Sequence, residues 1–377
     1  MSWSHFPFVL LSSAACSTSA FQLQSQQQSY LRALSSTSQT TTSTPKTLDD
    51  ITASVRIDST NGLRGLYANR DFNAKEILFE IPYELALLVG DTLVDGENGN
   101  KLIESDLDVQ SEDKDTVYDV YQALRLLNNI HSGNVWESQV QYLPPPNSSN
   151  EGGQTPDFWE EELIYELQIP EYIRQIMERK QIVGEVARKN NVDEDKLRWA
   201  TCMIRSRRFT TWDTVDHPEE KGVFGFPKKV DQIKGFLLPL IDMANHSNDP
   251  NAEMKISVNP WTRRFDNTSK FALHAVRPIG KDEEITISYG EGDWTCLQMM
   301  DKYGFFLEGC EADEKYAWDE LKCCFTTTVE EDEKEKRELL EKKDGHFGSR
   351  INMLSMRILV KRMMDKKILE RFMNKAT

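Results

Sequence analysis

Four short segments of this chain carry residue types that can bind or orient a polar ligand. Their ranges are 61–68, 204–207, 240–247 and 283–305. The guanidinium of Arg207 is always charged and presents a planar fork of donors, which suits a carboxylate. Asn245 can both donate and accept hydrogen bonds, and the hydroxyl of Tyr289 can orient an amine. Together these groups could hold a ligand that carries a carboxylate beside a reacting amine.

Simpler structural interpretations of the same residues stay open at this level. Gly62 and Gly65 would let the backbone approach a ligand closely, but they also suit a plain hairpin turn. Arg207 could be a surface cation that stabilises the end of a helix. For Arg205 and Arg208, that surface role is the interpretation we favour.

The other candidate side chains have ordinary alternatives as well. His246 alone is more typical of a structural histidine in a turn, and Asp242 could simply cap a turn. Tyr289, Tyr303 and Phe305 could be aromatic core packing, which is common for tyrosine and phenylalanine in a buried turn.

The motifs of several large enzyme classes are missing from the sequence. There is no G-x-x-x-x-G-K-[ST] loop and no strand-linked G-x-G-x-x-G, so nucleotide-binding folds of those types are disfavoured. There is also no G-x-S-x-G and no H-E-x-x-H. The sequence therefore lacks the parts of a hydrolase, a kinase or a zinc protease.

The elements that must position the four segments change in kind along the chain. Residues 55–89 have the pattern of short strands, with Ile77, Phe79 and Ile81 facing one side. Helices then follow to about residue 209, beginning with an apolar stripe over 117–127. Further helices are predicted over 157–167, 171–189 and 193–207, with Asp193 as an N-cap for the last.

The second half of the chain returns to strands and then to helices. The apolar run 236–241 predicts a buried strand, and the alternating runs 271–276 and 284–289 predict two more. A loop is expected over 144–155. After Gly309 the pattern is helical, with a mostly charged, solvated stretch at 330–344. This order predicts an α+β fold interrupted by a helical module rather than a regular α/β sheet.

In order and spacing, the four segments resemble the SET-domain methyltransferases, specifically the Rubisco large-subunit methyltransferase-like group. The motifs are Asn61-Gly62-Leu63-Arg64-Gly65, Arg205-Ser206-Arg207, Asn245-His246 and Tyr289-Gly290. The resemblance covers about residues 50–310. It implies a SET-type β-fold over 49–310, split by a helical insertion at about 92–209. A short helical region, 311–377, would be a truncated substrate-binding domain of this group.

The resemblance also implies roles for individual residues around S-adenosylmethionine. Tyr289 matches the catalytic tyrosine. The cofactor-binding positions of the family match Gly62, Leu63, Arg64, Arg207, Asn245, His246 and Phe305. The substrate-binding positions match Thr211, Asp242, Tyr289 and Tyr303. The implied activity is transfer of a methyl group to a lysine of a non-histone protein, because the cysteine cluster of many histone-directed relatives is missing.

Composition narrows the partners and the sites. The formal net charge of −16 disfavours nucleic-acid binding, which needs clustered Lys and Arg. No uncharged apolar stretch is long enough to cross a membrane. None of the six cysteines forms a C-x-x-C pair, so no metal site is predicted, and we interpret them as reduced, mostly structural thiols.

The first 48 residues differ from the rest of the chain. They contain no acidic residue and are rich in Ser, Thr and Gln, with an apolar stretch over 6–11. We interpret them as a targeting segment. Ser19-Ala20-Phe21 resembles the cleavage context of bipartite plastid presequences, although no Lys or Arg precedes the apolar stretch. A disordered tail on a cytoplasmic protein is the alternative.

The sequence therefore leads to one favoured function and two others. The favoured one is a plastid protein-lysine methyltransferase, with Rubisco or aldolase as the substrate class. Because a related enzyme methylates histidine, a protein-histidine methyltransferase is one alternative. A SET-fold binding module that has lost catalysis is the other.

Overall fold

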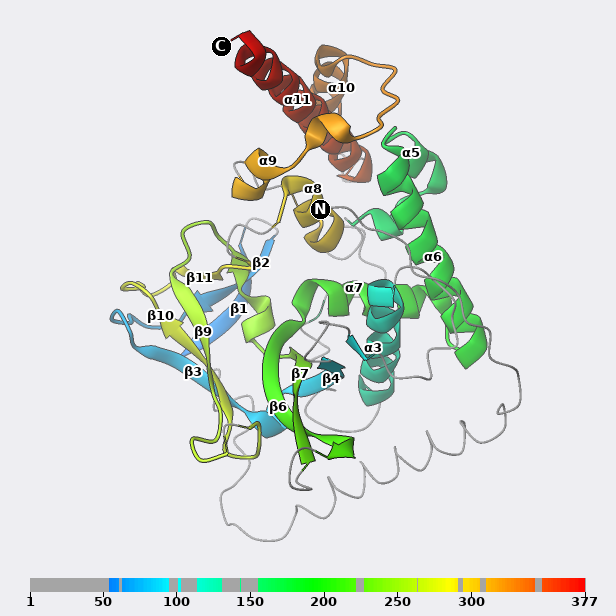
Figure 1. Cartoon of the computed structure of the whole chain (residues 1–377). Helices are drawn as coiled ribbons and strands as arrows, with labels where there is room; N and C mark the ends of the chain where they lie inside the picture. Colours follow the sequence, from blue (N-terminus) through cyan, green and yellow to red (C-terminus); the bar gives the residue numbers. More distant parts are fainter. Residues whose placement is uncertain are drawn as a thin grey trace, which may run out of the picture. The chain divides into compact units, whose positions relative to one another are not determined.

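The computed structural model describes most of the chain beyond residue 53 (Figure 1). The described ranges are 54–60, 63–94, 101–102, 114–130, 143, 155–221, 227–262, 264–290, 294–305, 310–342 and 348–376. The predicted targeting segment 1–48, the turn at Asn61-Gly62 and the predicted loop over 144–154 lie outside these ranges.

The first sheet joins the two ends of the predicted catalytic region. It contains β1 (Val55–Thr60), β2 (Leu63–Ala68), β11 (Glu284–Ile287) and β8 (Asn245–His246), in that order. The β2–β11 pairing is antiparallel, with Leu66 opposite Ile285. The β11–β8 pairing is parallel, with Thr286 opposite Asn245. Segments far apart in sequence therefore become neighbours within one sheet.

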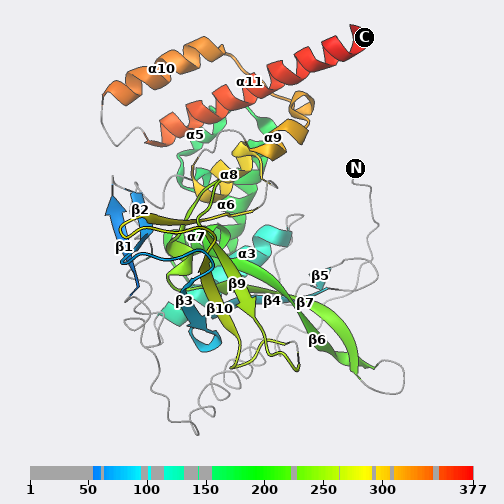
Figure 2. The same cartoon turned by 90° about the vertical axis from the view of Figure 1, so that its left-hand side faces the viewer.

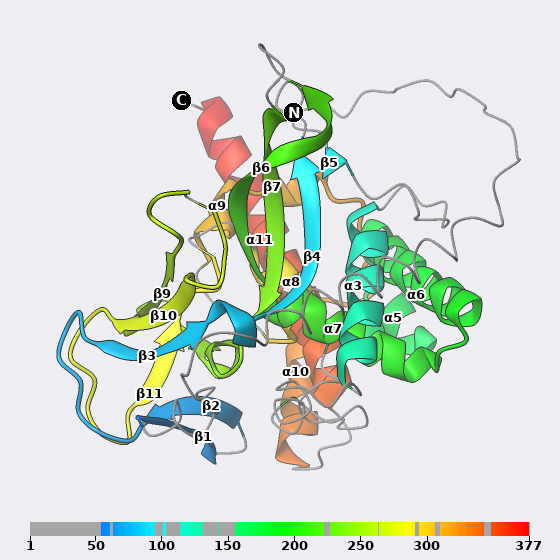
Figure 3. The same ribbon diagram turned by 90° about the horizontal axis from the view of Figure 1, so that it is seen from below.

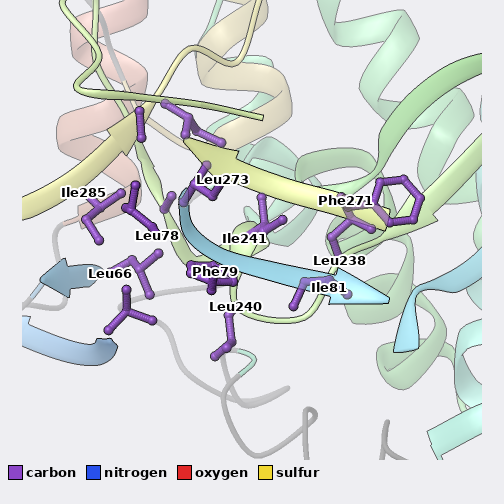
Figure 4. Packing of buried hydrophobic residues seen from close by; sticks show 14 of the residues in the cluster. Leu66, Leu78, Phe79, Ile81, Leu238, Leu240, Ile241, Phe271, Leu273 and Ile285 are labelled. Atoms are coloured by element: carbon purple, nitrogen blue, oxygen red, sulfur yellow. The ribbon is translucent and has the colours of Figure 1, made fainter. Parts of the chain in front are cut away.

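The second sheet is antiparallel, in the order β3 (Ile77–Pro82), β10 (Lys270–Ala275), β9 (Ala252–Ser257). The alternation predicted for β3 is confirmed only in part: Phe79 and Ile81 are buried, but Ile77 is exposed and Leu78 is buried as well. Figure 4 shows Leu78, Phe79 and Ile81 packed with side chains of β2, β10 and β11 in one apolar cluster. This core fixes the first two sheets to each other.

The third sheet was not predicted from the sequence. Its order is β5 (Lys101–Leu102), β4 (Leu87–Val94), β7 (Pro227–Leu237), β6 (Phe209–Lys221). It places β5 and the end of β4 inside the predicted helical insertion, so the insertion at 92–209 is not purely helical. The strand β6 is rich in Thr, Asp and Glu, and Trp212 on it is exposed. Such a strand lacks the apolar alternation by which strands are recognised.

The helices of the insertion pack beside this sheet, with α3 next to β4 (Figure 3). They are α3 (Lys114–Ile130), the 3₁₀ turn η2 (Pro156–Phe158), α5 (Glu161–Tyr165), α6 (Pro170–Asn190) and α7 (Glu194–Arg207). The predicted N-cap is confirmed, because the side chain of Asp193 accepts the backbone N–H of Lys196. The helix predicted over 157–167 is wrong in length, since only η2 and the short α5 form there.

The C-terminal part is helical, as predicted. It contains α8 (Cys296–Tyr303), α9 (Glu311–Lys315), η5 (Trp318–Glu320), α10 (Val329–Glu341) and α11 (Gly348–Ala376). Helices α10 and α11 pack against each other (Figure 2). The prediction of a solvated stretch at 330–344 is wrong for Asp332, which is 2% exposed and paired with Arg357 and Lys361. No described helix is long and apolar enough to cross a membrane.

Two predicted strands end earlier than expected. The strand β7 stops at Leu237, and Leu240 has φ 68° and ψ −43°. The carbonyl of Pro239 accepts the N–H of Ile241 at 2.8 Å, which makes this a classic γ-turn, a rare and strained conformation. A short 3₁₀ turn, η4 (Ile241–Met243), follows. The strand predicted over 284–289 ends at Ile287.

Candidate active site

Asn245 connects the three strands that meet at the centre of the first sheet. Its Nδ2 donates to the backbone oxygen of Arg64 at 2.8 Å and to Oε1 of Glu284 at 2.7 Å. A Cβ at position 65 would lie 2.6 Å from that Glu284 oxygen. The absence of a side chain at Gly65 therefore leaves space for the Glu284 carboxylate bound to Asn245. Glu284 was not predicted from the sequence, and its place in an alternating strand gave no signal for this role.

Tyr289 lies beside the Asn245-His246 segment and is held there twice. Its backbone N–H donates to Nδ1 of His246 at 3.0 Å, and its hydroxyl donates to the backbone oxygen of Ala244 at 2.8 Å. Burial raises the pKa of Tyr289 to about 12, so the phenol keeps its proton at neutral pH. Burial lowers the pKa of His246, which favours the neutral ring that can accept this hydrogen bond.

Four rings gather around this point. The Tyr289 ring lies 4.7 Å from that of Tyr303 and 6.4 Å from that of Phe305, measured between centroids. The His246 ring lies 5.3 Å from that of Tyr289 and 6.3 Å from that of Phe305. Burial also raises the pKa of Tyr303. An aromatic enclosure of this kind can hold a cationic or apolar group by its ring faces.

The end of α7 meets the γ-turn on the other side of the cluster. Nη1 of Arg207 donates to the backbone oxygen of Asp242 at 2.5 Å and contacts Sδ of Met243 at 3.7 Å. The Nε atom of Arg207 is buried and has no acceptor among the described residues. Burial raises the pKa of Asp242 to about 6, although Arg207 and Arg64 lower it. Arg207 thus contributes a cation with one N–H donor that has no acceptor among the described residues, and Asp242 contributes a carboxyl with a pKa of about 6.

Most of the predicted site residues are brought together. They are Arg64, Arg207, Asp242, Asn245, His246, Tyr289, Tyr303 and Phe305. Leu63 is the first residue of β2, but the structure does not describe its side chain or any part of Gly62. Thr211 lies on β6 opposite Lys234, and no described contact joins it to the ring cluster. Its assignment to substrate binding stays a prediction.

The structure corrects the surface role expected for two arginines. Arg205 binds Asp157 at 3.0 Å and Asp301 at 2.7 Å, and Arg179 binds the same two carboxylates at 2.5 and 2.7 Å. The two Arg residues hold the pKa of Asp301 well below its usual range. This buried quartet ties η2, α6 and α7 to α8, which carries Tyr303.

Arg208 is the second of these arginines. It pairs with Asp119 of α3, and its Nη1 donates to Oε1 of Gln122 at 3.0 Å. Both arginines stand in a run of basic residues at a helix end, a pattern that is more often exposed. The acids that pair with them are 48 to 96 residues away in sequence, so no local signal could have identified them.

Two cysteines lie close to the ring cluster. The Sγ atoms of Cys296 and Cys310 are 3.3 Å apart, and ligand atoms of these residues and Asp313 lie within 4.8 Å of one another. This grouping was not predicted from the sequence spacing. Burial raises the pKa of both thiols, which suits the protonated, structural role proposed for them.

With this geometry established, comparison with known proteins identifies the family. The sequence profile of the SET domain matches residues 63–290, which is more than half of the chain. The chain belongs to the SET-domain family. The match begins at the first residue of β2 and ends just after Tyr289, so it spans the strands that form the site. The α+β fold predicted from the sequence is confirmed.

Solved SET-domain structures are similar to this chain at low identity. The crystal structure of the SET domain of LSMT bound to lysine and AdoHcy has a TM-score of 0.49 and 15% identity, covering 92% of this chain and 92% of that chain. The structure of Rubisco LSMT bound to AdoMet has a TM-score of 0.48 and 15% identity, covering 87% and 89%. No curated protein matches this chain by sequence.

The residues present fit the cofactor implied by the sequence resemblance, S-adenosylmethionine. Arg207 keeps a buried donor without an acceptor in the described chain, which suits the carboxylate of an amino acid. Both amide hydrogens of Asn245 are already used, so its Oδ1 is the side-chain atom left to accept from an ammonium group. Phe305 and His246 offer ring faces for an adenine.

Proposed function

We propose that this SET protein is an S-adenosylmethionine-dependent protein-lysine N-methyltransferase. The observation that carries the proposal is the double attachment of Tyr289 to the segment Ala244–His246. It fixes a phenol between the candidate cofactor groups and the aromatic enclosure. A binding module without catalysis would have no need to hold this hydroxyl so closely.

The residues on one side of the phenol would hold the cofactor. Arg207 would bind its carboxylate, Oδ1 of Asn245 its ammonium group, and Phe305 its adenine. When bound, S-adenosylmethionine supplies an activated methyl group together with its leaving group. The protein therefore contributes mainly position and orientation, which can account for a large part of a rate enhancement.

On the other side, the rings would receive the lysine side chain. Tyr289 and Tyr303, 4.7 Å apart, would line the path of the acceptor. With a pKa of about 12, Tyr289 keeps its proton and donates it in a hydrogen bond to the backbone oxygen of Ala244. Its own oxygen can therefore accept an N–H of the amine and orient the amine lone pair. Asp242 would attract the incoming ammonium group, since opposite charges favour approach in a buried site.

For the target we propose a plastid protein of the class of Rubisco or aldolase. The acid-free, Ser- and Thr-rich segment 1–48 supports a plastid location. The net charge of −16 supports an acceptor that is locally basic. We place the chain in the Rubisco large-subunit methyltransferase-like group on the motifs and the helical insertion described above.

Labelled methyl transfer tests the proposal directly. The protein is incubated with methyl-tritiated S-adenosylmethionine and a plastid extract, and amino-acid analysis identifies the labelled residue. Label in methyl-lysine is the expected result. Label in methyl-histidine would change the acceptor class. Binding of the cofactor by calorimetry without any transfer would identify a SET-fold binding module instead.

A further inference from the structure

A cavity lies next to the candidate active site, and Lys302, whose Nζ is 5.2 Å from the Tyr303 ring centroid, lines it. Its volume is about 470 Å³, and its walls come from α3, α6, α7, α8 and the neighbouring ends of β6 and β7. Lys302 and Trp294 line it, together with Gln122 and Arg208. None of the residues given above a role in methyl transfer lines this cavity.

Lys302 is the cation of this cavity that lacks a carboxylate partner. Its Nζ lies 4.4 Å from the Trp294 ring centroid and 5.2 Å from that of Tyr303, and no carboxylate of the described chain is within ion-pair distance. Burial and the charge of Arg208 lower the pKa of Lys302 to about 8. An ammonium held against rings in this way would be stabilised by an incoming anion.

Most of the other charged side chains that line the cavity form ion pairs within the protein. Arg208 pairs with Asp119, and Arg179 and Arg205 pair with Asp301. Glu171 pairs with Arg174 on its own helix. Gln122 is 2% exposed, and its Nε2 has no acceptor among the described residues. The cavity wall thus has one cation, Lys302, without a carboxylate at ion-pair distance among the described residues, and one amide donor, Nε2 of Gln122, without an acceptor there. The remaining acid of the lining, Asp115, is exposed.

The position of Tyr303 relates this cavity to the candidate acceptor path. Its ring contacts that of Tyr289, at 4.7 Å, and Nζ of Lys302, at 5.2 Å. Consecutive residues of α8 therefore serve the two sites, and one ring separates them. A group on the acceptor chain a few residues from the target lysine could reach Lys302.

We propose that this cavity is a carboxylate subsite, with Lys302 as its cation and Trp294 beside it, and that it binds an Asp or Glu side chain near the target lysine of the acceptor protein. The proposal rests on the proposed function and adds a sequence preference to it. The lining also includes the apolar side chains of Ile169, Leu297 and Leu321, which could contact an apolar neighbour of that acid.

A scan of labelled peptides tests the subsite. The probes are synthetic fluorescein-labelled peptides with one central lysine, in which a single Glu, a matched Gln or an Arg is moved through each flanking position. Binding is measured by fluorescence anisotropy with S-adenosylhomocysteine present. We expect Glu at one offset to bind about tenfold more tightly than Gln, corresponding to about 1.4 kcal/mol. Lys302→Met should abolish this preference, and Lys302→Glu should transfer it to Arg at the same offset.

Lys281→Met, at an exposed turn lysine, is the matched control and should keep the Glu preference. Thermal unfolding of each variant confirms that it is folded. No Glu preference in the native chain, or a preference that survives in the folded Lys302→Glu variant, would overturn the proposal. Titration with succinate tests whether the subsite binds a free carboxylate compound rather than a side chain of the acceptor protein. If succinate binds in a Lys302-dependent manner and no peptide shows a Glu preference, the acceptor-protein assignment is wrong.

Failure of the proposed function is distinguishable from failure of the subsite. Anisotropy reports peptide binding whether or not a methyl group is transferred. Calorimetry with S-adenosylmethionine and transfer of labelled methyl to any peptide test the function itself. A native chain that transfers methyl groups without a Glu preference would therefore refute the subsite alone.

Discussion

The backbone N–H of Tyr289 donates a hydrogen bond of 3.0 Å to Nδ1 of His246. This contact joins the second residue after β11 to the last residue of β8, so the ring of His246 fixes the backbone position of Tyr289. The two residues of the Asn-His pair have separate structural roles. Asn245 links β2 to β11 by hydrogen bonds to Arg64 and Glu284, and His246 accepts a hydrogen bond from the segment that follows β11.

Replacing Tyr289 with Phe should abolish most methyl transfer while leaving the cofactor bound. Loss of the hydroxyl removes the group that orients the acceptor amine, and a misplaced reacting group can cost on the order of 100-fold in rate. Transfer of labelled methyl measures the rate, and calorimetry measures cofactor affinity, which should change by less than about threefold. Tyr165→Phe, at an exposed ring, is the control. Native-like transfer by Tyr289→Phe would show that the hydroxyl is not needed.

Asn245→Ala should destabilise the fold as well as weaken cofactor binding. The change leaves the Arg64 carbonyl and the Glu284 carboxylate without their shared donor, and an unsatisfied partly buried group costs about 1–3 kcal/mol. Urea unfolding gives the difference in free energy. Asn129→Ala is the control, because its Nδ2 donates to the backbone oxygen of Arg125 in its own helix at an exposed position. A stability equal to that of the native chain would contradict the bridging role.

Asp301→Ala should lower the free energy of unfolding by about 3–5 kcal/mol, because it leaves Arg179 and Arg205 buried with fewer partners. The pKa of Asp301 is held low by these arginines. Its contribution to stability is therefore present above the unfolded-state pKa and is lost as the pH falls toward the folded-state value. Urea unfolding at neutral pH measures the effect, and Asp249→Ala, at an exposed residue, is the control. A loss no larger than that of the control would refute the structural importance of the quartet.

Asp242→Asn should stabilise the protein at pH 7.5 relative to the native chain, but not at pH 4. The folded-state pKa of about 6 exceeds the unfolded value, so the contribution of the native carboxyl is greatest below the unfolded pKa. That contribution is lost as the pH rises through 6, which amounts to roughly 3 kcal/mol when complete. Thermal unfolding of the native protein and the variant at both pH values measures the contribution of the Asp242 carboxyl to stability. A difference in stability that is the same at both pH values would exclude Asp242 as its source.

Much of the scaffold could be predicted from the sequence, because its signals are local. The burial of Phe79 and Ile81, the stripe on α3 and the cap at Asp193 depend on residues a few positions apart, and all three are confirmed. Ile77 and Leu78 depart from the alternation predicted for β3, since Ile77 is exposed and Leu78 is buried. The family motifs also placed Asn245, His246 and Tyr289 together, and the β8–β11 pairing explains why. Asn245 and His246 pair with Thr286 and Ile287 in the first sheet, and Tyr289 follows two residues after Ile287.

The features that could not be predicted depend on distant partners or on unusual backbone. Nothing near Arg205 in sequence indicates Asp157 or Asp301. The polar strand β6 forms because β7 pairs with it, not because of its own pattern. The γ-turn at Leu240 places a buried, branched residue at positive φ, which the apolar run 236–241 gave no reason to expect.

The β2 strand depends on partners that are made much later during translation. Asn245 and Arg64 are separated by 181 residues, and at about 5–20 residues per second a ribosome needs about 10–40 s to bridge that gap. Until then the hairpin β1–β2 has an open edge, which invites pairing with other nascent chains. Correct assembly of this enzyme should therefore depend on how well that edge is shielded during synthesis.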